Sequence, residues 1–250
     1  MCQDCKEVKN YAKCICGSMV SKKPDPLFQQ MFNAAVSIKF KCLNHERGCT
    51  TILGEEALKA HEINCIYRLV TCPGFGCESM VPFHELLKHM KSSNHWGISY
   101  VMAKGEEIVD NYEVPEEALR VGGFKRKPAQ IFYDGKVFVY DLVNYVGGEN
   151  VYFWIQLIGS PEEAKNYCYT LKFHGNKPHI YTIYSGEMNS IEESFDEIIF
   201  FHNNCFGIKF SIFKKQFLDE NREYKVSIGI KNMKEEAKDD IKDSGNSNKD

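Results

Sequence analysis

The sequence predicts two parts: a small zinc-stabilised α+β double finger and, after it, an all-β antiparallel β-sandwich. Two observations support this division. Nine of the 11 cysteines lie at or before Cys77, and five of the eight histidines are interleaved with the later ones or follow them closely. The residues after about position 98 contain few cysteines and many aromatic and β-branched runs separated by turn residues. Clustered Cys and His indicate metal binding, and short strands joined by turns are typical of a sandwich.

The early cysteines and histidines form an internal repeat. In each unit a pair of cysteines is followed, after 11 intervening residues, by a histidine and then by a fourth ligand. The first unit contains Cys42, Cys49, His61 and Cys65, and the second contains Cys72, Cys77, His89 and His95. Four nitrogen and sulfur ligands suit tetrahedral Zn²⁺ and leave no open position for a substrate. We therefore expect two structural zinc ions, with no catalytic or cofactor-binding residue beside them.

A helix from Glu55 to Cys65 is expected in the first unit. It places His61 and Cys65 four residues apart on one face, where both can reach the same ion. His45 lies in the loop between the two cysteines of this unit and is expected to be solvated.

The fourth ligand of the second unit has an alternative. A helix beginning at Pro82 is expected to reach His89, and the gap from there to His95 is longer than one helical turn. The chain must therefore leave the helix by Asn94 to bring His95 back. His84 remains the alternative, although His84 and His89 are five residues apart and diverge around a helix.

A third group of cysteines precedes the repeat. Cys2, Cys5, Cys14 and Cys16 are candidates for a third zinc site. The last two are separated by one residue only, which is tight for chelation by both thiols of a pair.

The strands of the sandwich are expected where β-branched and aromatic residues alternate. The expected strands are Lys136–Val143, Val151–Ile158, Tyr169–His174, His179–Tyr184, Glu197–Phe201, Gly207–Phe213 and Tyr224–Ile230. Short helices are expected at Ser160–Ala164, with Ser160 as N-cap, and at Phe213–Leu218. The basic triplet Lys125–Lys127 is interpreted as a solvated loop.

Composition excludes several classes of function. The net charge of -3 offers no general attraction to nucleic acid, and the expected finger helices carry acidic residues such as Glu55 and Glu56. We see no apolar run of membrane-spanning length and no secretory signal. We expect a cytoplasmic protein, with the nucleus as a second compartment, and neither a nucleic-acid nor a membrane partner.

The repeat and the β-rich half together resemble the seven-in-absentia (Siah) family of RING-type E3 ubiquitin ligases. Residues 42–95, CLNHERGCTTILGEEALKAHEINCIYRLVTCPGFGCESMVPFHELLKHMKSSNH, match the family's double zinc finger ligand by ligand, apart from a longer spacing before His95. Ile155–Ser160 followed by Ala164–Leu171 resembles a hallmark of its substrate-binding domain. The resemblance covers roughly residues 24–232.

The resemblance implies a domain order and a role. Residues 1–23 would be a remnant of a RING finger, 24–97 a SIAH-type double zinc finger, and 98–232 a TRAF-like substrate-binding sandwich; composition makes 233–250 a disordered tail of mixed charge. Such a chain would bind degron-bearing partner proteins for ubiquitination and proteasomal degradation. It would form a homodimer through the sandwich, and a partner peptide would add as a strand near Gln130–Val139.

The resemblance departs from the family at the RING. Cys2 and Cys5 resemble the fifth and sixth ligands of a RING, and Cys14 and Cys16 resemble the last pair. The first four ligands have no counterpart in this sequence. Active ubiquitin transfer, with a ubiquitin-conjugating enzyme as partner, is therefore expected only if further sequence or a partner completes the RING.

Overall fold

The computed structural model describes residues 26–27, 30–31, 37–74, 76–146, 148–202 and 204–234. The expected third zinc site, the RING remnant and most of the expected tail lie outside these residues. The chain divides into two compact units, Met1–Arg68 and Leu69–Asp250. The two fingers therefore fall into different units, although the sequence suggested one module over 24–97.

The first finger is built from very short elements. Strands β1 (Phe40–Lys41) and β2 (Ile52–Leu53) pair antiparallel, and the 3₁₀ helix η1 (His45–Arg47) lies in the connection between them. Gly48 ends η1 with a φ of 108°, a left-handed value that favours glycine. Helix α3 (Glu55–Asn64) follows and ends one residue before Cys65, close to the expected position.

The second finger repeats this plan inside the second unit. Strands β3 (Leu69–Thr71) and β4 (Met80–Pro82) pair antiparallel, and the 3₁₀ helix η2 (Phe83–Glu85) leads into helix α4 (Leu86–Ser92). Helix α4 ends at Ser92, and Asn94 adopts a φ of 51° that reverses the chain. The backbone N–H of His95 then donates to the carbonyl of Met90, so the expected departure from the helix occurs.

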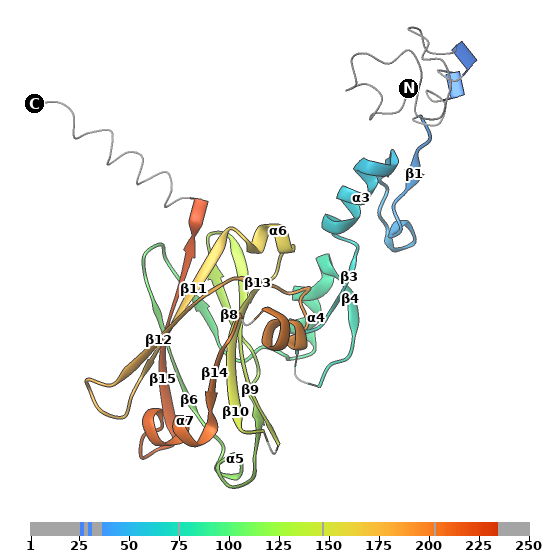
Figure 1. Cartoon of the computed structure of the whole chain (residues 1–250). Coiled ribbons are helices and arrows are strands. Elements are labelled where there is room, and N and C mark those ends of the chain that lie inside the picture. Colours follow the sequence, from blue (N-terminus) through green and yellow to red (C-terminus); the bar gives the residue numbers. More distant parts are fainter. Residues whose placement is uncertain are drawn as a thin grey trace, which may run out of the picture. The chain divides into compact units, whose positions relative to one another are not determined.

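A larger, mostly antiparallel sheet and a smaller antiparallel sheet form the sandwich (Figure 1). The larger sheet consists of β5 (Ser99–Val101), β7 (Gly122–Lys125), β8 (Ala129–Tyr133), β9 (Lys136–Val146), β10 (Asn150–Leu157), β13 (Asn189–Ser190) and β14 (Phe206–Lys209). The smaller sheet has the order β12 (Tyr181–Glu187), β11 (Tyr167–His174), β15 (Glu223–Asn232) and β6 (Ile108–Glu113). Two short strand pairs, β10 with β13 and β5 with β8, are parallel.

The facing sides of the sheets make one apolar core. Along β11, buried and half-buried residues alternate strictly, which is the period of a strand with one face covered. Phe153 of β10 meets Phe173 of β11 with ring centroids 4.7 Å apart, close to edge-on. This contact joins the centres of the two sheets, and aromatic pairs of this kind stabilise beyond the area they bury.

Short helices interrupt the strands. They are α5 (Glu116–Val121), α6 (Pro161–Ala164), the π-helix η3 (Glu197–His202) and α7 (Phe210–Phe217). The expected cap of α6 is confirmed: Ser160 and Glu163 form a capping box, with Pro161 at the first helical position. Within the described residues no helix is long and apolar enough to cross a membrane.

Two expected strands were wrong. Residues 197–201 form η3, because Ser194 and Glu197 exchange hydrogen bonds that start a helix: the hydroxyl accepts from the backbone N–H of Glu197, and the carboxylate accepts from that of Ser194. Of Gly207–Phe213 only the first residues are in a strand, and α7 begins at Phe210. Phe210, Phe213 and Phe217 are all buried, which is the spacing of a helical face.

The outer face of the larger sheet is covered. Val139 of β9 packs with Leu86 and Met90 of the second finger. Trp154 of β10 packs with Ile198 and Phe195 of the segment that precedes and includes η3. The second finger is therefore part of the sandwich's own packing.

The edge expected to receive a peptide is partly closed. Gln130, Ile131 and Phe132 of β8 pair with β5 on the side away from β9. A partner strand cannot lie directly beside this part of Gln130–Val139 while β5 remains in place.

The interpretation of the basic triplet as a solvated loop holds for Lys127, which is exposed, and is wrong for Lys125 and Arg126. Arg126 is 5% exposed, and its guanidinium donates to the carboxylate of Asp110, which is 1% exposed. Lys125 forms a salt bridge of 3.2 Å with the buried Asp141. Asp110 also accepts a 2.6 Å hydrogen bond from the hydroxyl of Tyr100. The pair Asp110–Arg126 therefore connects β6 of the smaller sheet to the end of β7 in the larger one.

Replacing Asp110 by Asn should destabilise the sandwich by about 3–5 kcal/mol, because the Arg126 charge stays buried without its partner. Urea unfolding followed by tryptophan fluorescence measures this loss. Glu113→Gln is the matched control, since Glu113 pairs with the partly exposed Arg222 and should have little effect. Equal effects of the two substitutions would contradict a dominant role for the buried pair.

Candidate metal centres

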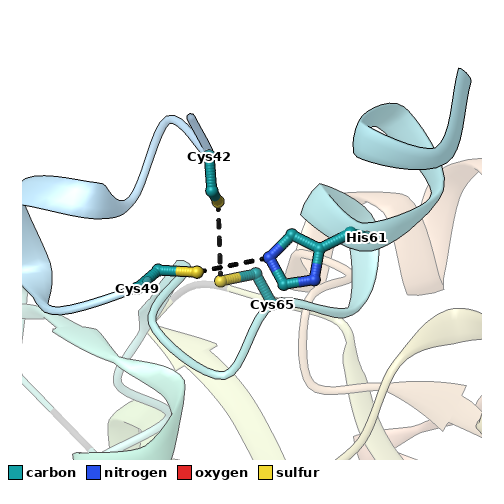
Figure 2. A group of neighbouring side chains, drawn as sticks. All are labelled: Cys42, Cys49, His61 and Cys65. Carbon is teal, nitrogen blue, oxygen red and sulfur yellow. Dashed lines mark hydrogen bonds between the residues drawn. The ribbon is translucent and has the colours of Figure 1, made fainter. Parts of the chain in front are cut away.

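The first cluster lies between the β1–β2 hairpin and α3 (Figure 2). The hairpin supplies Cys42 and Cys49, α3 supplies His61, and Cys65 follows its last residue. The Cys42 and Cys65 sulfurs are 3.8 Å apart, and Cys49 Sγ is 3.3 Å from His61 Nε2. All four candidate donor atoms lie within 4.8 Å of one another.

The second cluster lies between the β3–β4 hairpin and α4. Its four candidate donor atoms, from Cys72, Cys77, His89 and His95, also lie within 4.8 Å of one another. Cys77 Sγ is 3.4 Å from His89 Nε2. A Cβ on Gly74 would come within 2.5 Å of the His95 ring, so only glycine fits beneath that imidazole.

Both clusters fit a zinc ion. Cysteine sulfur and histidine nitrogen are the ligands Zn²⁺ prefers in closed four-coordinate sites. In the second cluster His95 Nε2 is buried and, within the described residues, has no hydrogen-bond partner. A ring nitrogen of this kind beside two thiols is costly unless something binds there.

Each of the five cluster cysteines accepts a backbone N–H from the residue two positions later. Asn44 N lies 3.4 Å from Cys42 Sγ, and Gly74 N lies 3.3 Å from Cys72 Sγ. The same relation joins Cys49 to Thr51, Cys65 to Tyr67 and Cys77 to Ser79. Such outer hydrogen bonds orient sulfur ligands and stabilise their negative charge.

The thiols differ in how readily they ionise. Hydrogen bonds from the hydroxyl and then the backbone N–H of Thr51 lower the pKa of Cys49 to about 6. Ser79 does the same for Cys77, whose pKa is also about 6. Burial raises the pKa of Cys72 to about 11 and also raises that of Cys65. Each cluster therefore combines an easily ionised thiol with a buried one that needs a cation nearby to lose its proton.

The structure brings together all eight residues expected as ligands. His84 stays outside the second cluster, where its Nε2 lies 3.8 Å from a Glu85 carboxylate oxygen. His45 lies in η1 and is exposed, as expected. Sequence reasoning missed Thr51 and Ser79, although a Thr or Ser two positions after a ligand cysteine was a visible signal.

Comparisons with known proteins support the fold and the family. The family model described as "Sina, TRAF-like domain" matches residues 130–229. The "E3 ubiquitin-protein ligase sina" of Drosophila melanogaster is 30% identical over 155 residues, which is 59% of this chain and 46% of the fly protein. Over more than half of its length the chain is similar to members of the seven-in-absentia family. The "E3 ubiquitin-protein ligase siah2" of Xenopus laevis is 24% identical over 180 residues, 69% of this chain and 55% of the frog protein.

The similarity to Siah proteins agrees with the order of the two structural parts. The chain has Cys/His fingers followed by a TRAF-like β-sandwich, as the sequence predicted. The matched regions make up only about half the length of these relatives. The activity and partners of a whole Siah protein are therefore matters of proposal for this chain.

Replacing His95 by Ala should remove one ligand of the second site, whereas His84→Ala should leave all four. Cobalt(II) in place of zinc gives visible absorption bands that report four-coordinate binding. We expect His95→Ala to lose the bands of the second site and His84→Ala to keep them. The opposite result would assign the fourth ligand to His84.

Proposed function

We propose that this chain is the substrate-recognition part of an E3 ubiquitin ligase, binding partner proteins that are then ubiquitinated and degraded by the proteasome. The observation that carries the proposal is the combination of two complete Cys/His clusters with a TRAF-like sandwich in a chain similar to Siah proteins. The relatives that match are named E3 ubiquitin-protein ligases.

Two structural zinc ions are part of the proposal. One would be held by Cys42, Cys49, His61 and Cys65, and the other by Cys72, Cys77, His89 and His95. When bound, zinc supplies a fixed tetrahedral centre that holds hairpin and helix together. The chain's own residues orient the sulfur ligands through the N–H and hydroxyl groups of Thr51 and Ser79. Cys2, Cys5, Cys14 and Cys16 are the candidates for a third ion, which is not part of the proposal.

The sandwich is the proposed partner-binding part. It offers a rigid core between two sheets, and rigid scaffolds hold binding surfaces in place. We place the protein in the cytoplasm, with the nucleus second, and as a homodimer through the sandwich. No role for nucleic acid or membrane is part of the proposal.

The proposal is tested by protein lifetimes. Proteins cross-linked to the wild-type chain in cells, but not to a Cys77→Ala variant, would be identified, and their decay followed after protein synthesis is blocked. We expect depletion of the chain to lengthen their half-lives at least about twofold, and a proteasome inhibitor to abolish the difference. Unchanged half-lives of every specifically bound protein would contradict the proposal.

The alternative is active ubiquitin transfer by a RING that includes Cys2, Cys5, Cys14 and Cys16. Purified chain would be mixed with ubiquitin, activating enzyme and a panel of conjugating enzymes. Ubiquitin chains that are formed with the wild-type protein but not with a Cys14→Ser variant would favour the alternative. Ubiquitin chains that are formed only when a full-length relative is added would favour the recognition role.

A further inference from the structure

Apolar side chains are exposed on the outer face of the smaller sheet. Val109 of β6 is 45% exposed, and Tyr181 and Ile183 of β12 are 56% and 54% exposed. These are large apolar side chains on strands at the two edges of that sheet. The outer face of the larger sheet, by contrast, is covered by the second finger and by the segment around η3.

The pairing of β12 with β11 determines which backbone groups of β12 point away from β11. Gly175 N donates to Ile180 O at 2.7 Å, and Met188 N donates to Tyr167 O at 3.2 Å. Both bonds fit the register that pairs His174 with Tyr181. In an antiparallel ladder every second residue bonds to a given neighbour, so the even-numbered residues of β12 bond to β11.

The odd-numbered residues of β12 therefore direct their N–H and C=O groups away from β11. They are Tyr181, Ile183, Ser185 and Glu187. Strand β12 is the last strand of its sheet, and among the described residues no other strand pairs with it (Figure 1). The edge thus presents a row of backbone donors and acceptors next to exposed apolar side chains, which is a template for another strand.

Positive charge lies beside this edge. Lys172 of β11 is directly opposite Ile183, and its Nζ is 5.0 Å from the centre of the Tyr181 ring. Lys225 of β15 lies opposite His174 on the same face. Neither lysine forms an ion pair with the described residues. Burial lowers the pKa of His174, the charges of Lys225 and Lys172 lower it further, and the charge of Glu107 raises it.

The other strand edges are less suited to pairing. The outward residues of β6 end at Glu113, which pairs with Arg222, and include the polar Asn111. Strand β5 at the edge of the larger sheet has three residues only. Charged, polar or short edges discourage strand addition, and on β12 the outward residues of this kind are Ser185 and Glu187.

We propose that the edge of β12 binds an extended acidic peptide of a partner protein, which adds as a fifth strand to the smaller sheet. Backbone groups of Tyr181, Ile183 and Ser185 hold the peptide, and Ile183 contacts an apolar side chain on it. Lys172 faces a carboxylate two positions away along the peptide. This inference rests on the proposed function, because it names the surface and the chemistry by which clients would be bound.

The test uses a labelled, capped seven-residue peptide, Thr-Glu-Thr-Val-Thr-Val-Thr, and its counterpart with Lys in place of Glu. Fluorescence anisotropy measures binding to the full chain. We expect the wild type to bind the Glu peptide about tenfold more tightly than the Lys peptide at low salt. Lys172→Glu should reverse this preference.

A proline pair tests the backbone contacts. Ser185→Pro removes an outward N–H without removing a backbone bond to β11, because only the even residues make those bonds; it also removes the 3.4 Å hydroxyl contact between Ser185 and Thr170 of β11. Asn111→Pro likewise removes an outward N–H from β6. The backbone N–H of Val114 donates to the carbonyl of Arg222, so the even-numbered residues of β6 bond to β15 and Asn111 points outward. We expect Ser185→Pro to weaken Glu-peptide binding about tenfold and Asn111→Pro to leave it unchanged. Thermal unfolding checks that both variants fold. If Ser185→Pro does not fold, the result for Lys172→Glu decides whether the inference stands.

Equal affinity of the wild type for the two peptides would overturn the inference, and so would equal effects of the two proline substitutions. A third contrary result would be a change from dimer to monomer in Ser185→Pro with peptide binding intact. The last would assign the edge to a second copy of the chain. Clients that keep their chain-dependent turnover in Ser185→Pro would sink the inference and leave the proposed function standing. Peptide binding without any client would sink the proposed function alone.

Discussion

Four sulfur and nitrogen atoms meet within 4.8 Å in each finger, and the finger depends on what holds them there. The first finger has two strands of two residues each and one helix of 10 residues. Apart from its cysteines, Leu58 is its one buried apolar residue among those described. A unit of this size cannot bury enough apolar surface to be stable, so a bound metal is the natural source of its folding free energy.

The two fingers share a plan and differ in their surroundings. Among the residues that the structure describes, the first has Leu53 and Tyr67 packed around its buried residues. The second contributes Leu86 and Met90 to a cluster that includes Val139 and Ile191 of the sandwich unit. Changes at the second metal centre therefore reach the outer face of the larger sheet.

Spacing along the chain was enough to predict the candidate metal centres. The repeated intervals and the helix before Cys65 identified eight residues that the structure brings together. The cap of α6 at Ser160 could also be predicted from the sequence. The predicted strand through Phe210 and Phe213 was wrong because it ignored the helical spacing of these two residues. Contacts between distant segments were not readable: the pairing of β5 with β8 and the burial of Arg126 on Asp110 depend on how the sheets pack. No local sequence pattern around the basic triplet predicts that Arg126 is buried.

The central claim is that metal in each cluster holds its finger together. Hydrogen exchange, measured by mass spectrometry on the zinc-loaded chain and again after a chelator has removed the metal, tests it most directly. The account predicts that the amides of α3 and α4 lose protection while those of β11 and β15 keep it. Unchanged protection of α3 and α4 in chain shown to be metal-free would contradict the account.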